Sequence, residues 1–326
     1  MSKDKAADIW AIPVPTRQAV SITGRRLVLY PFGQGTEGLV AHAMQEKSVS
    51  GFLNLTTSFV REYAREVSEE TGEEVAIDNY ARRMLMQEEF DLLFLLRYVS
   101  YGHLFPFIFT CPHCQYVTDE PMELDLSRCR RYLIECSDEA CECHEVNELC
   151  RETPDEEYHN FDFMSQHWTG VDPDHLEHAP PRLVYRPSSD MSLQRWSREA
   201  YEGLEFHFAF PTVSQKLRLA THSDDDNPEQ VRVWLEETIR RIVWPRHGID
   251  TQGERERDTR RDTRRVLRQI KEEALRMCLR SFLERKTGGL DARVRIVCPN
   301  PVCRQAVLQR VPVGKEFFMP VYLQTR

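Results

Sequence analysis

Two short cysteine motifs decide how this chain folds: Cys-Pro-His-Cys at residues 111–114 and Cys-Pro-Asn-Pro-Val-Cys at residues 298–303. Each motif lies between two apolar, strand-like runs, so we expect each to form the tip of a β-hairpin. Two thiolates from each of two hairpin tips suit a tetrahedral zinc ion. We therefore predict one structural zinc that joins two motifs separated by 183 residues. The predicted ligands are Cys111, Cys114, Cys298 and Cys303.

The composition is that of a soluble globular protein. The chain has 326 residues, 41% hydrophobic and 29% charged, which is enough for about two domains or for one domain with a large insertion. Its formal net charge of −9 counts against a broad nucleic-acid-binding surface. The charged N-terminus lacks the apolar segment of a signal peptide, and no apolar run is long enough to span a membrane. We expect folding in a cytoplasm, where ten cysteines favour metal over disulfides.

The spacing around the two motifs predicts an internal repeat. Nine positions separate Gly102 from Cys111, and nine separate Gly289 from Cys298. Between each glycine and its cysteine, every second residue is apolar, as in a strand with one buried face. These residues are Phe105, Phe107 and Phe109 in the first copy and Ala292, Val294 and Ile296 in the second.

We therefore predict an α+β fold with two pseudo-repeated helix–hairpin halves that share one zinc ribbon. The halves cover residues 1–126 and 201–326, and an acidic, Cys-rich, irregular insertion covers residues 127–200. On the return strands, Leu124 and Val313 each lie ten positions beyond the last cysteine of their pair. The alternative explanation is coincidence, because a helix, a turn and a strand often follow one another.

Apolar spacing also predicts the main helices. One helix covers residues 76–100, and another covers about 262–286 with apolar residues at intervals of four. A third begins at Asn227, an N-cap residue followed by proline, and carries Ile239 and Ile242 on one face.

The insertion holds a second group of metal donors. Its segment 127–180 has five cysteines and little periodicity, so we expect weak secondary structure stapled by metal. The alternatives are disulfides formed after lysis and a disordered loop. The ligand set stays open, because five thiols and a histidine compete for four positions. The candidates are Cys129, Cys136, Cys141, Cys143, His144 and Cys150.

No motif of a common enzyme class is present, so we expect a protein without catalytic activity. The chain has no glycine-rich phosphate loop, no nucleophile elbow and no His-Glu-x-x-His motif. A thiol redox enzyme is the alternative for Cys111 and Cys114, but such a pair belongs at a helix N-terminus and this one lies between strands. Aromatic residues near the motifs, Phe317 and Phe318 among them, either fill the core or dock against neighbouring subunits.

Several stretches resemble the T-even-type phage baseplate protein family, whose members include baseplate hub subunits and hub-assembly chaperones. The first half carries Leu-Leu-Arg-Tyr-Val-Ser-Tyr-Gly at 95–102, followed by a strand and the first cysteine pair. The second half carries Gly-Gly-Leu-Asp at 288–291 and Val-Pro-Val at 311–313, and Glu-Phe-Phe-Met-Pro follows at 316–320. The strand at 206–212 resembles the one that opens the family's second half. Two features depart from the pattern: the four-residue spacer of the second pair and the Cys-rich insertion.

The resemblance implies a structural or assembly role in the hub of a contractile tail baseplate, in a phage or in a phage-tail-like injection system. The implied partners are other baseplate and hub proteins, spike proteins and tube-initiator proteins, with neither a membrane nor nucleic acid involved. The implied location is the host cytoplasm during assembly and then the baseplate of the particle. The alternative function is a zinc-ribbon module that binds nucleic acid or acts in transcription.

Overall fold

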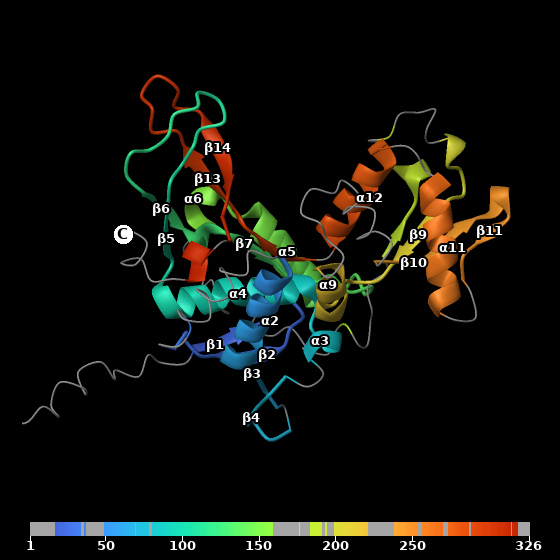
Figure 1. Ribbon diagram of the computed structural model, residues 1–326, viewed down its shortest axis with the longest axis horizontal. Helices are drawn as coiled ribbons and strands as arrows, with labels where there is room; N and C mark the ends of the chain where they lie inside the picture. Colours follow the sequence, from blue (N-terminus) through green and yellow to red (C-terminus); the bar gives the residue numbers. More distant parts are fainter. Residues whose placement is uncertain are drawn as a thin grey trace, which may run out of the picture.

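The protein has an α+β fold in which helices accompany small antiparallel sheets (Figure 1). The computed structural model describes residues 17–33, 36, 49–68, 70–77, 80–158, 176, 183–190, 193, 199–220, 238–252, 256–269, 273–286, 288–313 and 315–318. Among the helices within these ranges, none combines the length and apolar character needed to cross a bilayer.

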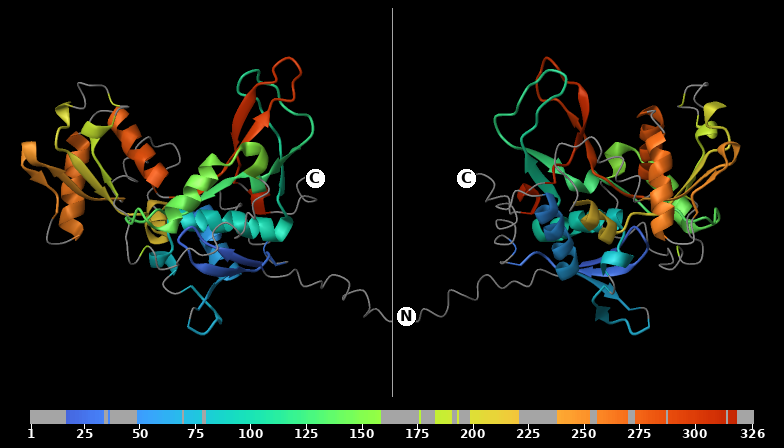
Figure 2. Two further views of the ribbon diagram at one scale, coloured as in Figure 1. Left: turned by 180° about the vertical axis from the view of Figure 1, so that it is seen from behind. Right: turned by 45° about the vertical axis from the view of Figure 1, so that its right-hand side comes forward.

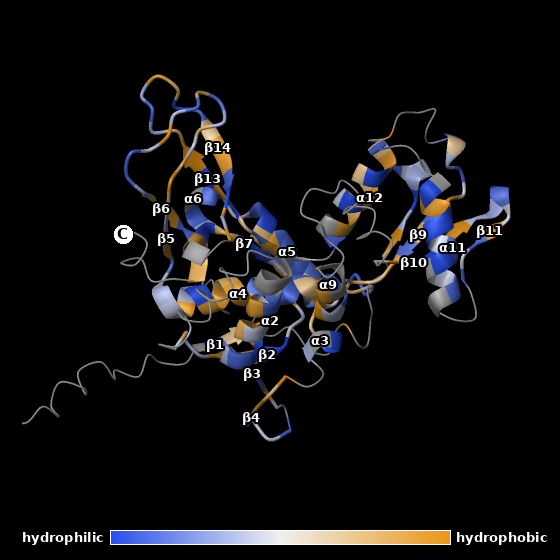
Figure 3. Ribbon diagram, in the orientation of Figure 1, coloured by the Kyte–Doolittle hydropathy of each residue, from blue (hydrophilic) through white to orange (hydrophobic). Residues whose placement is uncertain are grey.

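The body of the protein is built on a four-stranded antiparallel sheet and two helices. The strands follow one another in the order β1 (Arg17–Val20), β2 (Arg26–Leu29), β3 (Ala64–Val67) and β4 (Glu74–Val75). Helix α2 (Val49–Tyr63) packs against α4 (Met86–Tyr101), and α4 is apolar along most of its length (Figure 3). Helix α4 ends at Gly102, whose positive φ of 81° suits glycine and whose N–H donates to the Tyr98 carbonyl. The buried apolar residues around α4 form one cluster, which we call the first core.

Two hairpins rise from α4 side by side (Figures 1 and 2). The first pairs β5 (Leu104–Phe107) with β6 (Met122–Asp125), and the second pairs β13 (Arg293–Val297) with β14 (Ala306–Arg310). Phe105 and Val294 are buried in the same apolar cluster as α4. Segments from the two ends of the sequence therefore share one core.

The insertion is more regular than its sequence predicts. It contains β7 (Arg130–Tyr132), α5 (Glu142–Glu152) and α6 (Asp155–Tyr158), preceded by the 3-10 turn Leu126–Arg128. Strand β7 pairs with β12 (Gly289–Asp291), which precedes the second hairpin. The expectation of weak structure is thus wrong for 130–132, 142–152 and 155–158, whereas 133–141 have neither helix nor strand. Residues 159–175 and 177–182 lie outside the described ranges.

A fully buried ion pair fixes this insertion to the body. Both Arg131 and Asp91 have side chains with no exposed surface. Arg131 Nε donates to Asp91 Oδ1 at 2.6 Å, Nη2 donates to Oδ2 at 2.7 Å, and Nη2 also donates to the Val20 carbonyl at 2.9 Å. Nearby, Gly288 has a φ of 61°, and a Cβ there would lie 2.9 Å from the Leu133 carbonyl oxygen. The insertion is therefore packed into the body at both β7 and the residue that follows it.

A second apolar cluster forms a separate lobe, which we call the second core. Its sheet has the order β11 (Ile249–Asp250), β10 (Ile239–Trp244), β9 (Glu205–Phe208) and β8 (Val184–Tyr185). Its helices are α11 (Glu256–Gln269) and α12 (Glu273–Lys286). Helix α9 (Val213–Ala220) lies between the lobes and packs on α2 and on the short α3 (Tyr80–Arg83). Buried Lys216 of α9 forms an ion pair with Glu89 of α4.

Thr238 is helical, but the helix predicted to start at Asn227 is wrong at Ile239 and Ile242. These residues lie in strand β10, while 221–237 are outside the described residues. The register of β10 against β9 shifts between Ile239 and Arg241, as at a β-bulge. The extra residue brings Ile239 and Ile242 to the same buried face three positions apart. The bulge therefore gives the buried residues of β10 the spacing that is typical of a helix.

The other helix predictions are confirmed in part. The span 76–100 contains α3 and all of α4 except Tyr101. The span 262–286 contains the C-terminal part of α11, which begins earlier at Glu256, and all of α12. Buried residues of α12 belong to the second core, whereas α4 lies under both hairpins in the first core. The helix–hairpin repeat is therefore not confirmed for the helices. The predicted division at 126 and 200 stays a prediction, and side-chain packing groups 292–318 with the first half of the chain.

Candidate metal centre

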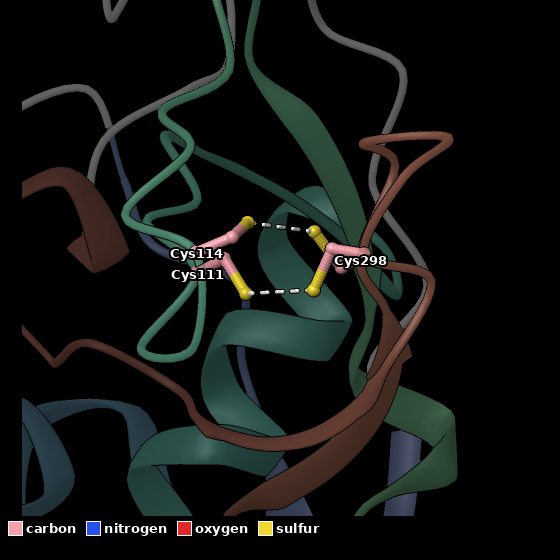
Figure 4. Close-up of side chains that lie close together, drawn as sticks. Cys111, Cys114 and Cys298 are labelled. Carbon is pink, nitrogen blue, oxygen red and sulfur yellow. Dashed lines mark hydrogen bonds between the residues drawn. The ribbon is translucent and has the colours of Figure 1, made fainter.

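Four thiols from the two hairpin tips converge on one point, which we call the four-thiol site. Figure 4 shows Cys111 and Cys114 on one loop facing Cys298 on the other. Cys111 Sγ lies 3.9 Å from Cys303 Sγ, and Cys114 Sγ lies 3.8 Å from Cys298 Sγ. All four sulfurs lie within 4.8 Å of one another.

These distances suit a metal ion and exclude disulfides. Zinc–sulfur bonds of about 2.3 Å place the sulfurs of a tetrahedral site about 3.8 Å apart. A disulfide would need its two sulfurs at about 2.05 Å. The four-thiol site can therefore hold one tetrahedral ion that prefers soft ligands, and four sulfurs would fill its coordination sphere.

The first loop is closed by backbone hydrogen bonds. Cys111 N–H donates to the Tyr116 carbonyl at 2.9 Å, and Gln115 N–H donates back to the Cys111 carbonyl at 2.9 Å. Gln115, directly after the second cysteine, has a φ of 57°. This left-handed residue turns the chain so that both thiols point the same way.

The second loop closes in the same way despite its longer spacer. Cys298 N–H donates to the Gln305 carbonyl, which lies two positions after the second cysteine, as Tyr116 does in the first loop. Arg304, directly after Cys303, has a φ of 45° and donates its N–H to Asn300. The two extra residues are accommodated before this turn, so Cys303 reaches the other thiols.

Asn300 connects the two loops, and the sequence prediction did not include it. Its side-chain amide Nδ2 lies 3.8 Å from Cys114 Sγ, and its Oδ1 accepts from Val302 N–H at 3.0 Å. Amide donors to sulfur stabilise the thiolate that a metal requires. The Asn-Pro dipeptide at 300–301 was the available signal, since asparagine side chains commonly bond to the backbone two residues on.

The two hairpins have equal lengths measured from strand to strand. Phe105 pairs with Leu124, and Ala292 accepts from Val311 N–H at 2.8 Å, so the partners lie 19 positions apart in both hairpins. The first hairpin has two more residues than the second between its last cysteine and the paired strand residue. The second hairpin has two more residues than the first between its cysteines. The predicted equivalence of Leu124 with Val313 is therefore wrong, because Val311 takes that place.

Burial and hydrogen bonding act in opposite directions on the thiols. Burial raises the pKa of Cys111, but backbone N–H groups of Cys114 and His113 and the neighbouring thiols lower it to about 7 overall. For Cys298, burial and the adjacent thiols raise the pKa to about 12, against the lowering effect of the Asn300 N–H. Cys111 and Cys298 are buried and Cys114 is exposed, so the site lies at the surface of the core. His113 is exposed, as expected for a residue that is not a ligand.

The aromatic residues near the motifs fill the core. Phe317 and Phe318 are fully buried. The ring of Phe317 is tilted against that of Phe94, with 4.7 Å between the centroids, and the centroids of Phe318 and Phe59 lie 5.3 Å apart. The three phenylalanines of the β5 segment, Phe105 to Phe109, are buried too. The suggestion that these rings dock against neighbouring subunits is wrong, and the alternative interpretation as core residues is confirmed.

The insertion's donors are only partly brought together. Sulfur atoms of Cys136 and Cys143 and a ring nitrogen of His144 lie within 4.8 Å of one another. Cys141 packs against the apolar cluster that contains both sulfurs. Cys129 is buried in the first core instead, and Cys150 donates from Sγ to the Arg131 carbonyl at 3.4 Å. Cys129 and Cys150 are therefore not part of this group.

Comparisons with protein-family models, with curated proteins and with solved structures returned no match.

Proposed function

We propose that this protein is a structural component or assembly factor of a contractile tail or injection-system baseplate, in the hub region, and that a structural zinc ion holds its two hairpins together. The observation that carries the zinc part is the set of sulfur separations, 3.8 and 3.9 Å, which match the edges of a zinc–thiolate tetrahedron. Four thiolates leave no coordination position for water or substrate. The ion therefore contributes folding energy and performs no catalysis.

Zinc is the metal we assign, because thiolates select soft or borderline ions and tetrahedral four-sulfur sites are typical of zinc. The two hairpins then form one zinc ribbon. Equal strand-to-strand lengths of 19 positions and a left-handed residue directly after each second cysteine support their origin as two copies of one unit.

The assignment to a baseplate rests on the resemblance of the stretches at 95–102, 288–291 and 316–320 to the phage baseplate family. The partners would be hub, spike and tube-initiator proteins, contacted without a membrane. The proposal makes a genetic prediction: genes for sheath, tube and spike proteins should lie next to this one.

Deletion of the gene tests the assignment directly. In a host that produces the particle, we expect electron microscopy to show tubes and sheaths that fail to assemble on a complete baseplate, with rescue by the wild-type gene in trans. Normal particles from the deletion strain would contradict the role in assembly.

A basic face on the second hairpin favours a second candidate, a nucleic-acid-binding zinc ribbon. In the β13–β14 pairing, Arg293 lies opposite Arg310 and Arg295 lies opposite Leu308, and all four side chains are exposed. Arg293 pairs with Asp291, but among the described residues no acidic side chain forms an ion pair with Arg295 or Arg310. Arginines on a projecting β-ribbon can contact phosphates even in an acidic protein.

Filter binding separates the two candidates. Nucleic-acid binding that weakens steeply with salt, and whose salt dependence falls by about one phosphate contact in Arg295→Ala, would favour the second candidate. Absence of binding at low salt would leave the baseplate proposal as the better one.

A further inference from the structure

A second group of metal donors lies where β7 leads into α5. Cys136 follows β7, Cys141 is the N-cap residue of α5, and Cys143 and His144 belong to the first turn of that helix. These four donors fall within nine positions of the sequence. A strand end and a helix start thus bring soft donors together locally, independently of the four-thiol site.

Three of these donors, Cys136, Cys143 and His144, lie as close together as the donors of the four-thiol site. Cys143 Sγ lies 3.8 Å from Cys136 Sγ, which is again the edge of a zinc–thiolate tetrahedron and far from a disulfide bond. A ring nitrogen of His144 lies within 4.8 Å of both sulfurs. Cys141 packs against the apolar cluster that contains Cys136 and Cys143, and its thiol makes no capping hydrogen bond to the helix.

The surroundings hold the histidine ring in place. His144 Nε2 lies 3.2 Å from the Cys136 carbonyl oxygen. Nδ1 lies 3.9 Å from a Glu135 carboxylate oxygen, beyond hydrogen-bond distance, so it is the nitrogen left for a metal. A carbonyl or carboxylate partner on one ring nitrogen is what orients a histidine that binds metal through the other. The positive end of the α5 dipole also favours thiolates in the first turn of the helix.

We propose that Cys136, Cys141, Cys143 and His144 bind a second structural zinc ion. Three thiolates and one imidazole are a common ligand set for structural zinc. The ion would fix the start of α5 to the segment that follows β7. Its ligands Cys136 and Cys143 belong to a small third apolar cluster together with Ile22, Leu133 and Ile134. The proposal goes beyond the baseplate function and does not depend on it.

Metal counting on the full-length protein tests the proposal. Protein purified without chelator is measured by native mass spectrometry and by elemental analysis, as wild type and as Cys143→Ser, Cys141→Ser and Cys150→Ser. Cys150 is the matched control, because it is a buried cysteine of the same helix outside the donor group. We expect two zinc ions in the wild type and in Cys150→Ser, and one in Cys143→Ser.

Cobalt substitution of the wild type provides a readout that needs no variant. Two cobalt ions should bind, with ligand-field spectra that differ between a four-sulfur site and a three-sulfur, one-nitrogen site. One metal per wild-type chain that a folded Cys143→Ser retains would overturn the proposal, and so would a folded Cys143→Ser that keeps two. Loss of one zinc from folded Cys150→Ser, or retention of two by Cys141→Ser, would overturn this ligand set. Zinc lost from the four-thiol site is measured independently, with the variant Cys298→Ser.

Discussion

The four-thiol site contrasts with the four donors Cys136, Cys141, Cys143 and His144, which we call the α5 group. Both have a sulfur–sulfur distance of 3.8 Å, but they join parts of the chain that are separated by very different lengths of sequence. In the four-thiol site, Cys114 and Cys298 lie 184 positions apart in the sequence, whereas in the α5 group Cys136 and Cys143 lie seven positions apart. Because the entropy of loop closure grows with the logarithm of loop length, closing the longer loop costs about 3 kcal/mol more. The four-thiol site should therefore control the global fold, and the α5 group should control local order.

The largest effect should come from disrupting the four-thiol site. Because structural zinc binding in small domains contributes about 10 kcal/mol, loss of this ion should remove most of the stability of the first core. We expect Cys298→Ser, or wild type with a strong chelator, to unfold at a much lower temperature by circular dichroism. Cys278→Ser is the control, since Cys278 is a half-buried thiol packed against the second core. A melting curve for Cys298→Ser equal to that of the control would contradict the account.

The next largest effect should come from the buried ion pair that attaches the insertion without metal. Asp91→Leu leaves the Arg131 guanidinium buried without its carboxylate, which should cost about 3–5 kcal/mol of unfolding free energy in urea. The four-thiol site should keep its zinc in the folded fraction. The double variant Asp91→Leu/Arg131→Met should recover most of the loss, because it removes both charges. A double variant no more stable than Asp91→Leu would show that the loss of unfolding free energy does not come from the unpaired charge of Arg131.

A smaller and local effect is expected at Asn147 of α5. Its Oδ1 accepts from Leu133 N–H and its Nδ2 donates to the Leu133 carbonyl, both at 2.8 Å. Asn147→Leu leaves these two backbone groups unpaired and should cost about 1–3 kcal/mol. Hydrogen exchange should accelerate at 133–136 and remain unchanged in the two hairpins. Faster exchange throughout the hairpins would show that the two regions are not separable.

The smallest effect is expected on the exposed face of the second hairpin. Arg295→Ala removes an exposed side chain with no ion pair among the described residues, so unfolding free energy should change by less than about 0.5 kcal/mol. Zinc content should not change. A large loss of zinc or stability in this variant would mean that the hairpin depends on its surface as well as on its metal.

Much of the four-thiol site could be predicted from the sequence, because cysteine pairs between strands carry their own spacing signal. The sequence did not show whether Cys303 would reach the other three thiols, because this depends on the left-handed turn at Arg304. The bulge in β10 could not be predicted from the sequence either. One extra residue in a strand places two buried side chains three positions apart, and a helix gives the same spacing.

The ion pair in the core was missed although a signal was present. Asp91 stands in an otherwise apolar run of α4, and a buried acid needs a buried partner. The partner could not be identified, because Arg131 lies 40 positions away within a segment that has no periodicity. The proposed ligands of the α5 group were all among the candidates predicted from the sequence, but only the fold separates Cys136, Cys143 and His144 from Cys129 and Cys150.

Native mass spectrometry of Cys111→Ser, Cys298→Ser and the double variant tests the central claim most directly, with folding verified by circular dichroism. If both hairpins bind one ion, each single variant has one zinc fewer than wild type, and the double variant has the same number as each single variant. A double variant that loses two zinc ions where each single variant loses one would show that the hairpins bind separate ions, and the account of a shared site would be wrong.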